Sequence, residues 1–214
     1  MENLINYDYI KNYISDLTPE TSTFMQTLEI FAYYNHVPII TKDTRRFLEV
    51  FLRISKPEKI LEVGTAIGYS AITFANILKD ARITTIEIEE EMFDLAYKNI
   101  NKAGYGDRIN IIHDDARNIL PYLETTYDFI FMDAAKGQYT EYYEPAKKLL
   151  KSGGVLISDN ILFKGMVAND ELVPRNKRAI VNDLNDFNKA LSEDEDFITT
   201  FIPIGDGLAI SLKK

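Results

Sequence analysis

The sequence predicts an α/β fold: a seven-stranded, mostly parallel sheet with helices on both faces and accessory helices at the N-terminus. Three observations predict it. An apolar strand at 60–63 runs through a glycine turn directly into a helix, strand and helix patterns alternate over 82–158, and a hairpin pattern closes the chain. Sheets of this kind bind ligands at the carboxyl ends of their strands.

Two stretches with helical spacing precede the glycine turn, at residues 9–34 and 41–54. The second places four apolar residues on one face: Phe47, Leu48, Phe51 and Leu52. We interpret both stretches as accessory helices. The single domain predicted for residues 1–214 therefore consists of accessory helices (1–56) and an α/β core (57–214).

After the glycine turn, the apolar period alternates between that of a strand and that of a helix. Strands are predicted at 82–88, 108–113, 127–132 and 154–158. Helices are predicted at 90–103 and 139–150, with a separate short helix that ends at Leu120 and a last helix that begins at Pro174. The last helix carries an apolar stripe of Ile180, Leu184, Phe187 and Leu191. A hairpin of 197–204 and 208–212, across Gly205-Asp206-Gly207, completes seven strands.

Composition restricts the classes of function. The net charge of −9 and the pI near 4.8 argue against broad, nonspecific nucleic-acid binding. The absence of cysteine excludes disulfides and thiolate metal sites. Met1-Glu2-Asn3-Leu4 does not begin a signal peptide, and no stretch reaches membrane-spanning length. We therefore expect a soluble, cytoplasmic protein with no membrane partner.

Two local groups of cations could still contact a polyanion. The first consists of Lys42, Arg45 and Arg46. The second, called the basic cluster below, consists of Lys164, Arg175, Lys177 and Arg178. Considered alone, each group is better explained as the solvated face of a helix.

The glycine turn favours S-adenosylmethionine (SAM) over a dinucleotide. A dinucleotide fingerprint requires glycine at three positions, which are here Gly64, Ala66 and Tyr69. Glu62, inside the strand, suits the ammonium and sulfonium of SAM better than a phosphate. Glu87 ends the next strand, which is where an acid binds both hydroxyls of a ribose in folds of this kind. The alternative interpretation of Glu87 is an ordinary surface acid.

Asp115 and Ala116 follow the third predicted strand. A carboxylate at this place could accept a hydrogen bond from an adenine amino group. Capping of the following helix explains Asp114 and Asp115 equally well.

Three side chains with oxygen donors fall at the ends of two further strands. Asp133 follows residues 127–132, and Asp159 and Asn160 follow the next strand. Capping of the following loop explains any one of these side chains, but it does not explain why all three lie at the carboxyl edge of the sheet. We therefore predict a site for Mg²⁺ or another oxygen-preferring divalent cation. Lys136 would lie beside the ion, whose charge disfavours the protonated amine and makes Lys136 a candidate base. An ordinary surface lysine is the alternative.

These segments resemble the cation-dependent O-methyltransferases, which include the catechol and caffeoyl-coenzyme A enzymes. The resemblance rests on residues 61–70, Met132-Asp133-Ala134-Ala135-Lys136 and Ser158-Asp159-Asn160, and it covers nearly the whole chain. Within that family, the chain is similar to the bacterial tRNA 5-hydroxyuridine methyltransferases, at residues 36–39, 64–72, 133–139, 162–168 and 205–211.

The resemblance implies a Rossmann-like fold of the class I SAM-dependent methyltransferases and a homodimer. It implies that Asp133, Asp159 and Asn160 bind Mg²⁺, and that Lys136 and Asp133 act at the reacting oxygen. It also implies a set of contacts to SAM: Ile40, Gly64, Ser70, Glu87, Asp115, Ala116 and Asp133.

The expected reaction is SAM- and Mg²⁺-dependent methylation of 5-hydroxyuridine in the tRNA anticodon to 5-methoxyuridine, with the basic cluster contacting the tRNA. The 5-hydroxyl and the adjacent carbonyl can chelate one ion as the two oxygens of a catechol do. Methylation of small catechols or phenols is the alternative, favoured by the acidic net charge. A SAM-binding protein without catalysis leaves the metal ligands and Lys136 unexplained.

Overall fold

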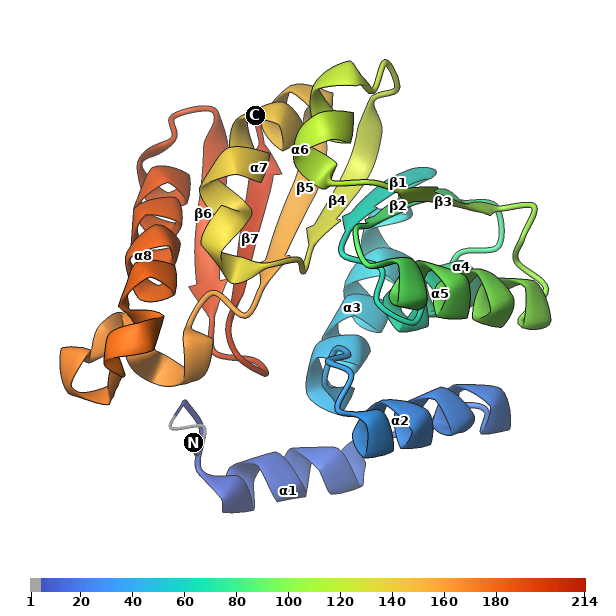
Figure 1. The fold of residues 1–214 in the computed structure, drawn as a ribbon, viewed down its shortest axis with the longest axis horizontal. Helices are drawn as coiled ribbons and strands as arrows, with labels where there is room; N and C mark the ends of the chain where they lie inside the picture. The colour runs from blue at the N-terminus through green and yellow to red at the C-terminus, as the bar shows by residue number, and fades with distance from the viewer. Residues whose placement is uncertain (1–4) are drawn as a thin grey trace. The chain divides into compact units, whose positions relative to one another are not determined.

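The computed structural model describes residues 5–214, which form eight α-helices and seven strands (Figure 1). Met1-Glu2-Asn3-Leu4, considered above for a signal peptide, lies outside the described residues. The chain is organised as two compact units. We call Tyr9–Ala116 the N-terminal unit, and Arg117–Lys214 with the segment through Asp8 the C-terminal unit. No described helix has the length and apolarity needed to cross a membrane.

The N-terminal unit contains three parallel strands in the order β3-β2-β1. They are β1 (Lys59–Val63), β2 (Arg82–Glu87) and β3 (Ile109–His113). The helices of this unit are α1 (Asp8–Leu17), α2 (Thr23–Asn35), α3 (Lys42–Ser55), α4 (Tyr69–Ile77) and α5 (Glu90–Lys102). Four of the five β1 side chains are buried, which is typical of a strand covered on both faces.

The first predicted helical stretch is divided in the structure. Helix α1 ends at Leu17, and α2 begins only at Thr23. Ser22 caps α2 by accepting a hydrogen bond from the Met25 N–H, and Pro19 lies in the connection. The nearest apolar residues on either side, Leu17 and Phe24, are seven residues apart and so keep helical spacing, and the period alone therefore did not predict the break.

The C-terminal unit contains four strands in the order β4-β5-β7-β6. They are β4 (Tyr127–Met132), β5 (Leu150–Asp159), β6 (Phe197–Ile202) and β7 (Leu208–Lys213). Strand β4 is parallel to β5, and the other pairs are antiparallel. The strand predicted at 154–158, after a turn at Ser152-Gly153-Gly154, begins earlier in the structure, because β5 already starts at Leu150. Gly153 at φ 75° and a register shift opposite β4 accommodate this irregular start.

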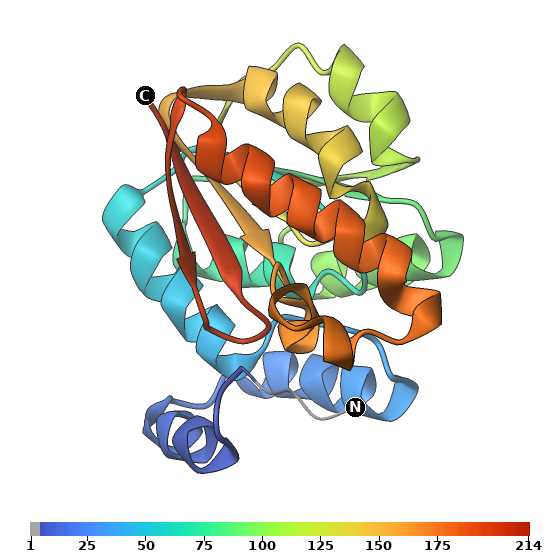
Figure 2. The same ribbon diagram turned by 90° about the vertical axis from the view of Figure 1, so that its left-hand side faces the viewer.

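Helices α7 (Tyr139–Leu149) and α8 (Arg178–Glu193) pack against each other in this unit (Figure 2). A short helix, α6 (Ala116–Ile119), precedes β4 in the sequence. The rings of Tyr139 and Tyr143 meet Phe187 edge-on, with centroids 5.2 and 5.8 Å apart. The buried stripe of α8 begins at Val181 rather than Ile180. Both residues fit the helical period with Leu184, and only packing selects between them.

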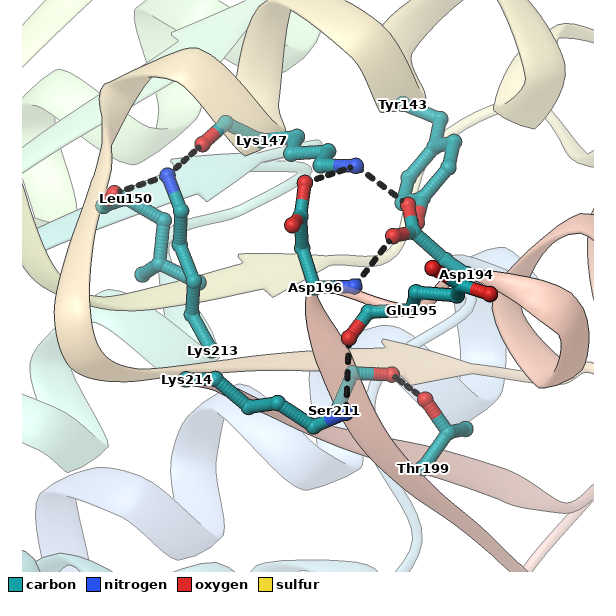
Figure 3. A network of polar contacts seen from close by, with 10 residues as sticks. All are labelled: Tyr143, Lys147, Leu150, Asp194, Glu195, Asp196, Thr199, Ser211, Lys213 and Lys214. Carbon is teal, nitrogen blue, oxygen red and sulfur yellow. Dashed lines mark hydrogen bonds and ion pairs between the residues drawn. The ribbon is translucent and has the colours of Figure 1, made fainter.

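A polar network connects the residues after α8 to α7 (Figure 3). The Asp194 carboxylate accepts hydrogen bonds from the Tyr143 hydroxyl and the Lys147 amine, and Lys147 also pairs with Asp196 at 2.8 Å. Burial opposes the charge of Asp194, but the hydrogen bonds from Lys147 and Tyr143 outweigh it and lower its pKa. The hydrogen bonds to Asp194 and Asp196 raise the pKa of Lys147.

We expect Asp194→Asn to lower the free energy of unfolding by about 2 kcal/mol at pH 7, because it removes a charged acceptor. A carboxylate with a lowered folded pKa stabilises the fold above its unfolded pKa, about 3.9, and that contribution is lost as the pH falls through the folded pKa. The difference from wild type should therefore shrink below about pH 4. Urea unfolding at pH 7 and at successively lower pH measures it.

The matched control is Glu193→Gln, which neutralises an exposed acid one residue away, 3.9 Å from Lys189. Exposed pairs of this kind contribute little, so the control should leave stability nearly unchanged. A loss for Asp194→Asn that stays constant as the pH falls would contradict the electrostatic explanation.

Candidate functional site

The glycine turn lies at the carboxyl end of β1 and follows a left-handed path. Gly64, Ala66 and Gly68 have φ values of 100°, 46° and 83°, and Gly68 is the N-cap of α4. A Cβ at Gly68 would touch Ala96 of α5 at 3.5 Å, so the turn packs closely on that helix. The first N–H groups of α4, including that of the buried Ser70, have no acceptor within the helix and can bind a ligand oxygen.

Glu87 holds this turn in place. Its Oε2 accepts hydrogen bonds from the N–H groups of Thr65 and Ala66 at 3.1 and 2.7 Å. Its Oε1 accepts from the Glu89 N–H at 2.9 Å. The side chain is 7% exposed, which does not fit the alternative role of a solvated surface acid. A carboxylate has about four acceptor positions, so this one retains capacity for a ligand hydroxyl.

Glu62 lies inside β1 and is fully buried. It accepts a hydrogen bond at 2.6 Å from the hydroxyl of Thr85 on β2, and the Thr85 hydroxyl is also hydrogen-bonded to that of Thr65. Glu62 is therefore linked through two hydroxyls to the glycine turn.

The predicted adenine contacts lie at the start of α6. The Asp114 carboxylate accepts from the Asp115 N–H at 2.7 Å, so Asp114 satisfies a local backbone donor. Ala116 is buried. The structure therefore places Asp115 and Ala116 after β3, as predicted.

Ile40 lines a cavity of about 210 Å³ in the N-terminal unit. The other lining residues are Glu20, Glu29, Ile39, Lys42, Arg45 and Tyr69. Pockets for small molecules usually reach about 300–1,000 Å³, so this cavity is too small to enclose a whole nucleoside cofactor.

The first group of cations is largely satisfied within the N-terminal unit. Lys42 pairs with Glu20 at 2.7 Å, and Arg46 pairs with Glu49 at 2.8 Å. Arg45 is 8% exposed and donates to the Pro19 carbonyl at 3.1 Å, so the interpretation of this residue as solvated is wrong. This group does not offer three free cations to a polyanion.

In the C-terminal unit, Asp133 follows β4, and Asp159 is the last residue of the neighbouring parallel strand β5. Met132 of β4 pairs with Ser158 of β5, which brings the two next residues together. Asp159 is 2% exposed, and its burial, followed by the charge of Asp133, raises its pKa well above the usual value. Asn160 comes next, at φ 58°, and its N–H donates to Asp159 Oδ1 at 2.6 Å.

This donor set fits an oxygen-preferring divalent cation. Two neighbouring carboxylates, of which Asp159 is buried and Asp133 partly exposed, repel each other, and a divalent cation offsets that repulsion. Within residues 5–214, no three His, Cys, Asp or Glu side chains gather as ligands. The predicted set therefore needs the Asn160 amide as its third oxygen donor.

Lys136 lies in the 3₁₀ turn Lys136–Gln138, between β4 and α7. Its Nζ is 3.1 Å from Asp133 Oδ1, and its side chain is 23% exposed. The ion pair with a predicted ligand places this amine beside the donor set.

Tyr139 connects the two strand ends and was not among the predicted site residues. Its fully buried hydroxyl donates to the carbonyls of Asp159 at 3.0 Å and Met132 at 3.3 Å. Burial, followed by the charges of Asp133 and Asp159, raises the pKa of Tyr139 well above its usual value, so the hydroxyl remains a donor. Only its position at the end of the segment 133–139 pointed to it in the sequence.

The basic cluster lies on the segment after β5 and at the start of α8. Lys164, Arg175 and Arg178 are exposed, and Lys177 is partly exposed. Over the described part of the chain, no carboxylate forms an ion pair with any of the four. Unlike the first group, these cations are available to a polyanion.

Comparison with known proteins gives consistent matches. The family model described as O-methyltransferase matches residues 15–214. The caffeoyl-CoA O-methyltransferase of Populus kitakamiensis is 36% identical over 176 residues, covering 78% of this chain and 75% of the relative.

Two solved structures are also similar. A Staphylococcus aureus protein described as a candidate caffeoyl-CoA O-methyltransferase has a TM-score of 0.91 and 37% identity, covering 97% of this chain and all of that one. The Bacillus cereus O-methyltransferase in complex with SAH has a TM-score of 0.82 and 29% identity, covering 96% and 97%. The predicted Rossmann-like, class I methyltransferase fold is confirmed. The chain belongs to the O-methyltransferase family.

Proposed function

We propose that this chain transfers the methyl group of SAM to a substrate oxygen held beside Asp133, Asp159 and Asn160, and that the substrate is 5-hydroxyuridine in tRNA. The set formed by the buried Asp159, the partly exposed Asp133 and the neighbouring Asn160 amide carries the proposal, because it fits a cation that binds two adjacent substrate oxygens. The Bacillus cereus relative in complex with SAH supports the choice of cofactor.

SAM, when bound, supplies the methyl group, and a divalent cation lowers the pKa of the hydroxyl that it binds. Asp133, Asp159 and Asn160 hold the cation, and Glu87 and the N-terminus of α4 hold the cofactor. A bound cation would disfavour the protonated form of Lys136, and the neutral Nζ beside Asp133 would then accept the hydroxyl proton. The protein then has to hold the oxygen in line with the methyl group, which is catalysis by orientation.

The basic cluster supports tRNA as the substrate. None of its four cations forms an ion pair with a carboxylate in the described part of the chain, and all four belong to the same unit as the oxygen donors. Affinity for a polyanion comes mainly from such local cations, whatever the net charge. An acidic protein can therefore bind tRNA through this surface.

We expect Arg175→Ala, Lys177→Ala and Arg178→Ala together to raise the KM for hydroxyuridine-bearing tRNA and to flatten its salt dependence. Each lost phosphate contact lowers the slope of log K against log salt by about 0.7 to 0.9. Methyl transfer at several salt concentrations measures both effects. A triple Lys/Arg→Ala variant at Lys42, Arg46 and Arg53, which pair with acids in the N-terminal unit, is the control. Parental KM and salt slope in the first variant would show that the basic cluster is only a solvated surface.

Methylation of a small catechol or phenol is the second candidate. The relatives named as caffeoyl-CoA O-methyltransferases and the net charge of −9 favour it. SAM consumption with hydroxyuridine-bearing tRNA, compared with a catechol, separates the candidates. Turnover of the catechol with no turnover of the tRNA would replace the tRNA proposal.

We also propose that the chain forms a homodimer. Helix α1 has no buried residue, and its Tyr13 and Leu17 side chains are 65% and 67% exposed. An apolar helix surface of this kind is typical of an interface. Light scattering at micromolar concentration tests it, and a monomer mass would reject it.

A further inference from the structure

The loop that follows the predicted metal ligands takes an uncommon backbone path. Asn160, Phe163 and Lys164 have φ values of 58°, 44° and 59°, and Gly165 has 83°. Left-handed φ values are sterically unfavourable for residues with a Cβ, least for Asn and most for bulky residues such as Phe. Such a path persists only where surrounding contacts hold it.

The turn between β6 and β7 supplies those contacts. The Asp206 carbonyl accepts from the Leu162 N–H at 3.0 Å, and Asp206 Oδ1 accepts from the Lys164 N–H at 2.5 Å. The Gly207 carbonyl accepts from the Ile161 N–H at 3.1 Å. Three N–H groups of the loop therefore donate hydrogen bonds to two residues of the turn.

Gly207 allows the turn and the loop to meet this closely. It has φ 88°, and a Cβ there would lie 2.3 Å from Leu162 Cγ. From α8, Asn188 Nδ2 donates to the Ile161 carbonyl at 3.0 Å. The loop path is thus imposed by residues distant in sequence.

Asp206 lies two residues before Leu208, which pairs with Asp159 across β5 and β7. Its negative charge acts on Asp159, and the positive charge of Lys136 acts on Asp206. A charged carboxylate is also a stronger acceptor for the Lys164 N–H than a neutral group. The side chain is therefore placed where the loop path and the ligand set meet.

We propose that Asp206 is a positioning residue for metal binding, because it holds loop 160–165 in the left-handed path that presents Asn160 as the third ligand. This inference rests on the proposed function, which takes Asp133, Asp159 and Asn160 as the metal ligands. It assigns to the Gly205-Asp206-Gly207 turn a role beyond joining two strands.

Calorimetric titration of the full chain with Mn²⁺ tests the proposal. Asp206→Ala should weaken Mn²⁺ binding about tenfold, because the competent loop conformation loses a hydrogen bond to a charged group. Asp206→Asn keeps an acceptor for the Lys164 N–H and should lose no more than about threefold. SAM affinity should be unchanged in both. Asp170→Ala removes an exposed carboxylate from the same connecting segment and should behave as wild type.

A second substitution tests the mechanism. Glycine adopts the φ of Lys164 without steric cost, so Lys164→Gly should make the loop less dependent on Asp206. In the Asp206→Ala background it should recover about threefold in Mn²⁺ affinity. Urea unfolding without metal checks that each variant is folded. If Asp206→Ala does not fold, Asp206→Asn with and without Lys164→Gly carries the test.

The outcomes are distinguishable. Wild-type Mn²⁺ affinity in Asp206→Ala overturns the positioning role and leaves the proposed function intact. Equal losses of Mn²⁺ affinity in Asp206→Asn and Asp206→Ala, with no recovery by Lys164→Gly, would show that Asp206 acts through its charge. That result also overturns the positioning role. A wild-type chain that binds no Mn²⁺ removes the metal from the proposed function, and this inference with it.

Discussion

Asp159→Asn is expected to reduce kcat/KM at least about 100-fold while the fold stays intact. The substitution removes one of two anionic ligands, and metal activation of a hydroxyl contributes several kcal/mol, each 1.4 kcal/mol being about tenfold in rate. The Asn side chain can still accept the hydrogen bond that the Asn160 N–H now donates to Asp159 Oδ1. Because burial and Asp133 already disfavour the charge of Asp159, the neutral variant should be no less stable without metal.

Methyl transfer with and without EDTA measures the effect, and EDTA should reduce the wild type to the level of the variant. Asp128→Asn is the matched control, since it makes the same change at the other end of β4, where Asp128 pairs with Lys151. It should retain wild-type activity. Full wild-type activity in chelator, with no metal retained by the protein, would contradict the metal assignment.

Glu87→Ala is expected to weaken SAM binding by about 1.5–3 kcal/mol, or roughly 10- to 150-fold, the range for hydrogen bonds to a charged group. The structure gives a second reason. The carboxylate accepts from the N–H groups of Thr65, Ala66 and Glu89, so its loss also frees the glycine turn. Calorimetry with SAM measures the change, and Mn²⁺ affinity should barely move.

Glu90→Ala is the control for Glu87→Ala. It removes an exposed acid from the first turn of α5, three residues away, with the same change in net charge. SAM affinity should stay at the wild-type value. Unchanged SAM affinity in Glu87→Ala would leave Glu87 with a structural role in the turn and no role in binding the cofactor.

The strands that were predicted best are those whose burial makes them largely apolar. Residues 127–132 form β4 as predicted, because a strand covered on both faces is largely apolar, here with Asp128 as its one polar residue. The start of β5 was missed, because Ser152-Gly153-Gly154 has the composition of a turn and pairing with its neighbours makes it a strand. The break between α1 and α2 was missed although Pro19 and the capping Ser22 mark it, because the apolar residues on its two sides, Leu17 and Phe24, keep helical spacing.

For the site, the sequence by itself determined which residues end the strands, since that position depends on local patterns. Asp133, Asp159 and Glu87 were found in this way. Tertiary structure alone decided which contacts the polar side chains make and which of them are buried. The Tyr139 hydroxyl between two strand ends, the Asp206 carboxylate on loop 160–165 and the burial of Arg45 all depend on contacts between segments distant in sequence. Such contacts leave no local period, because they are selected by packing and hydrogen bonding once the elements have formed.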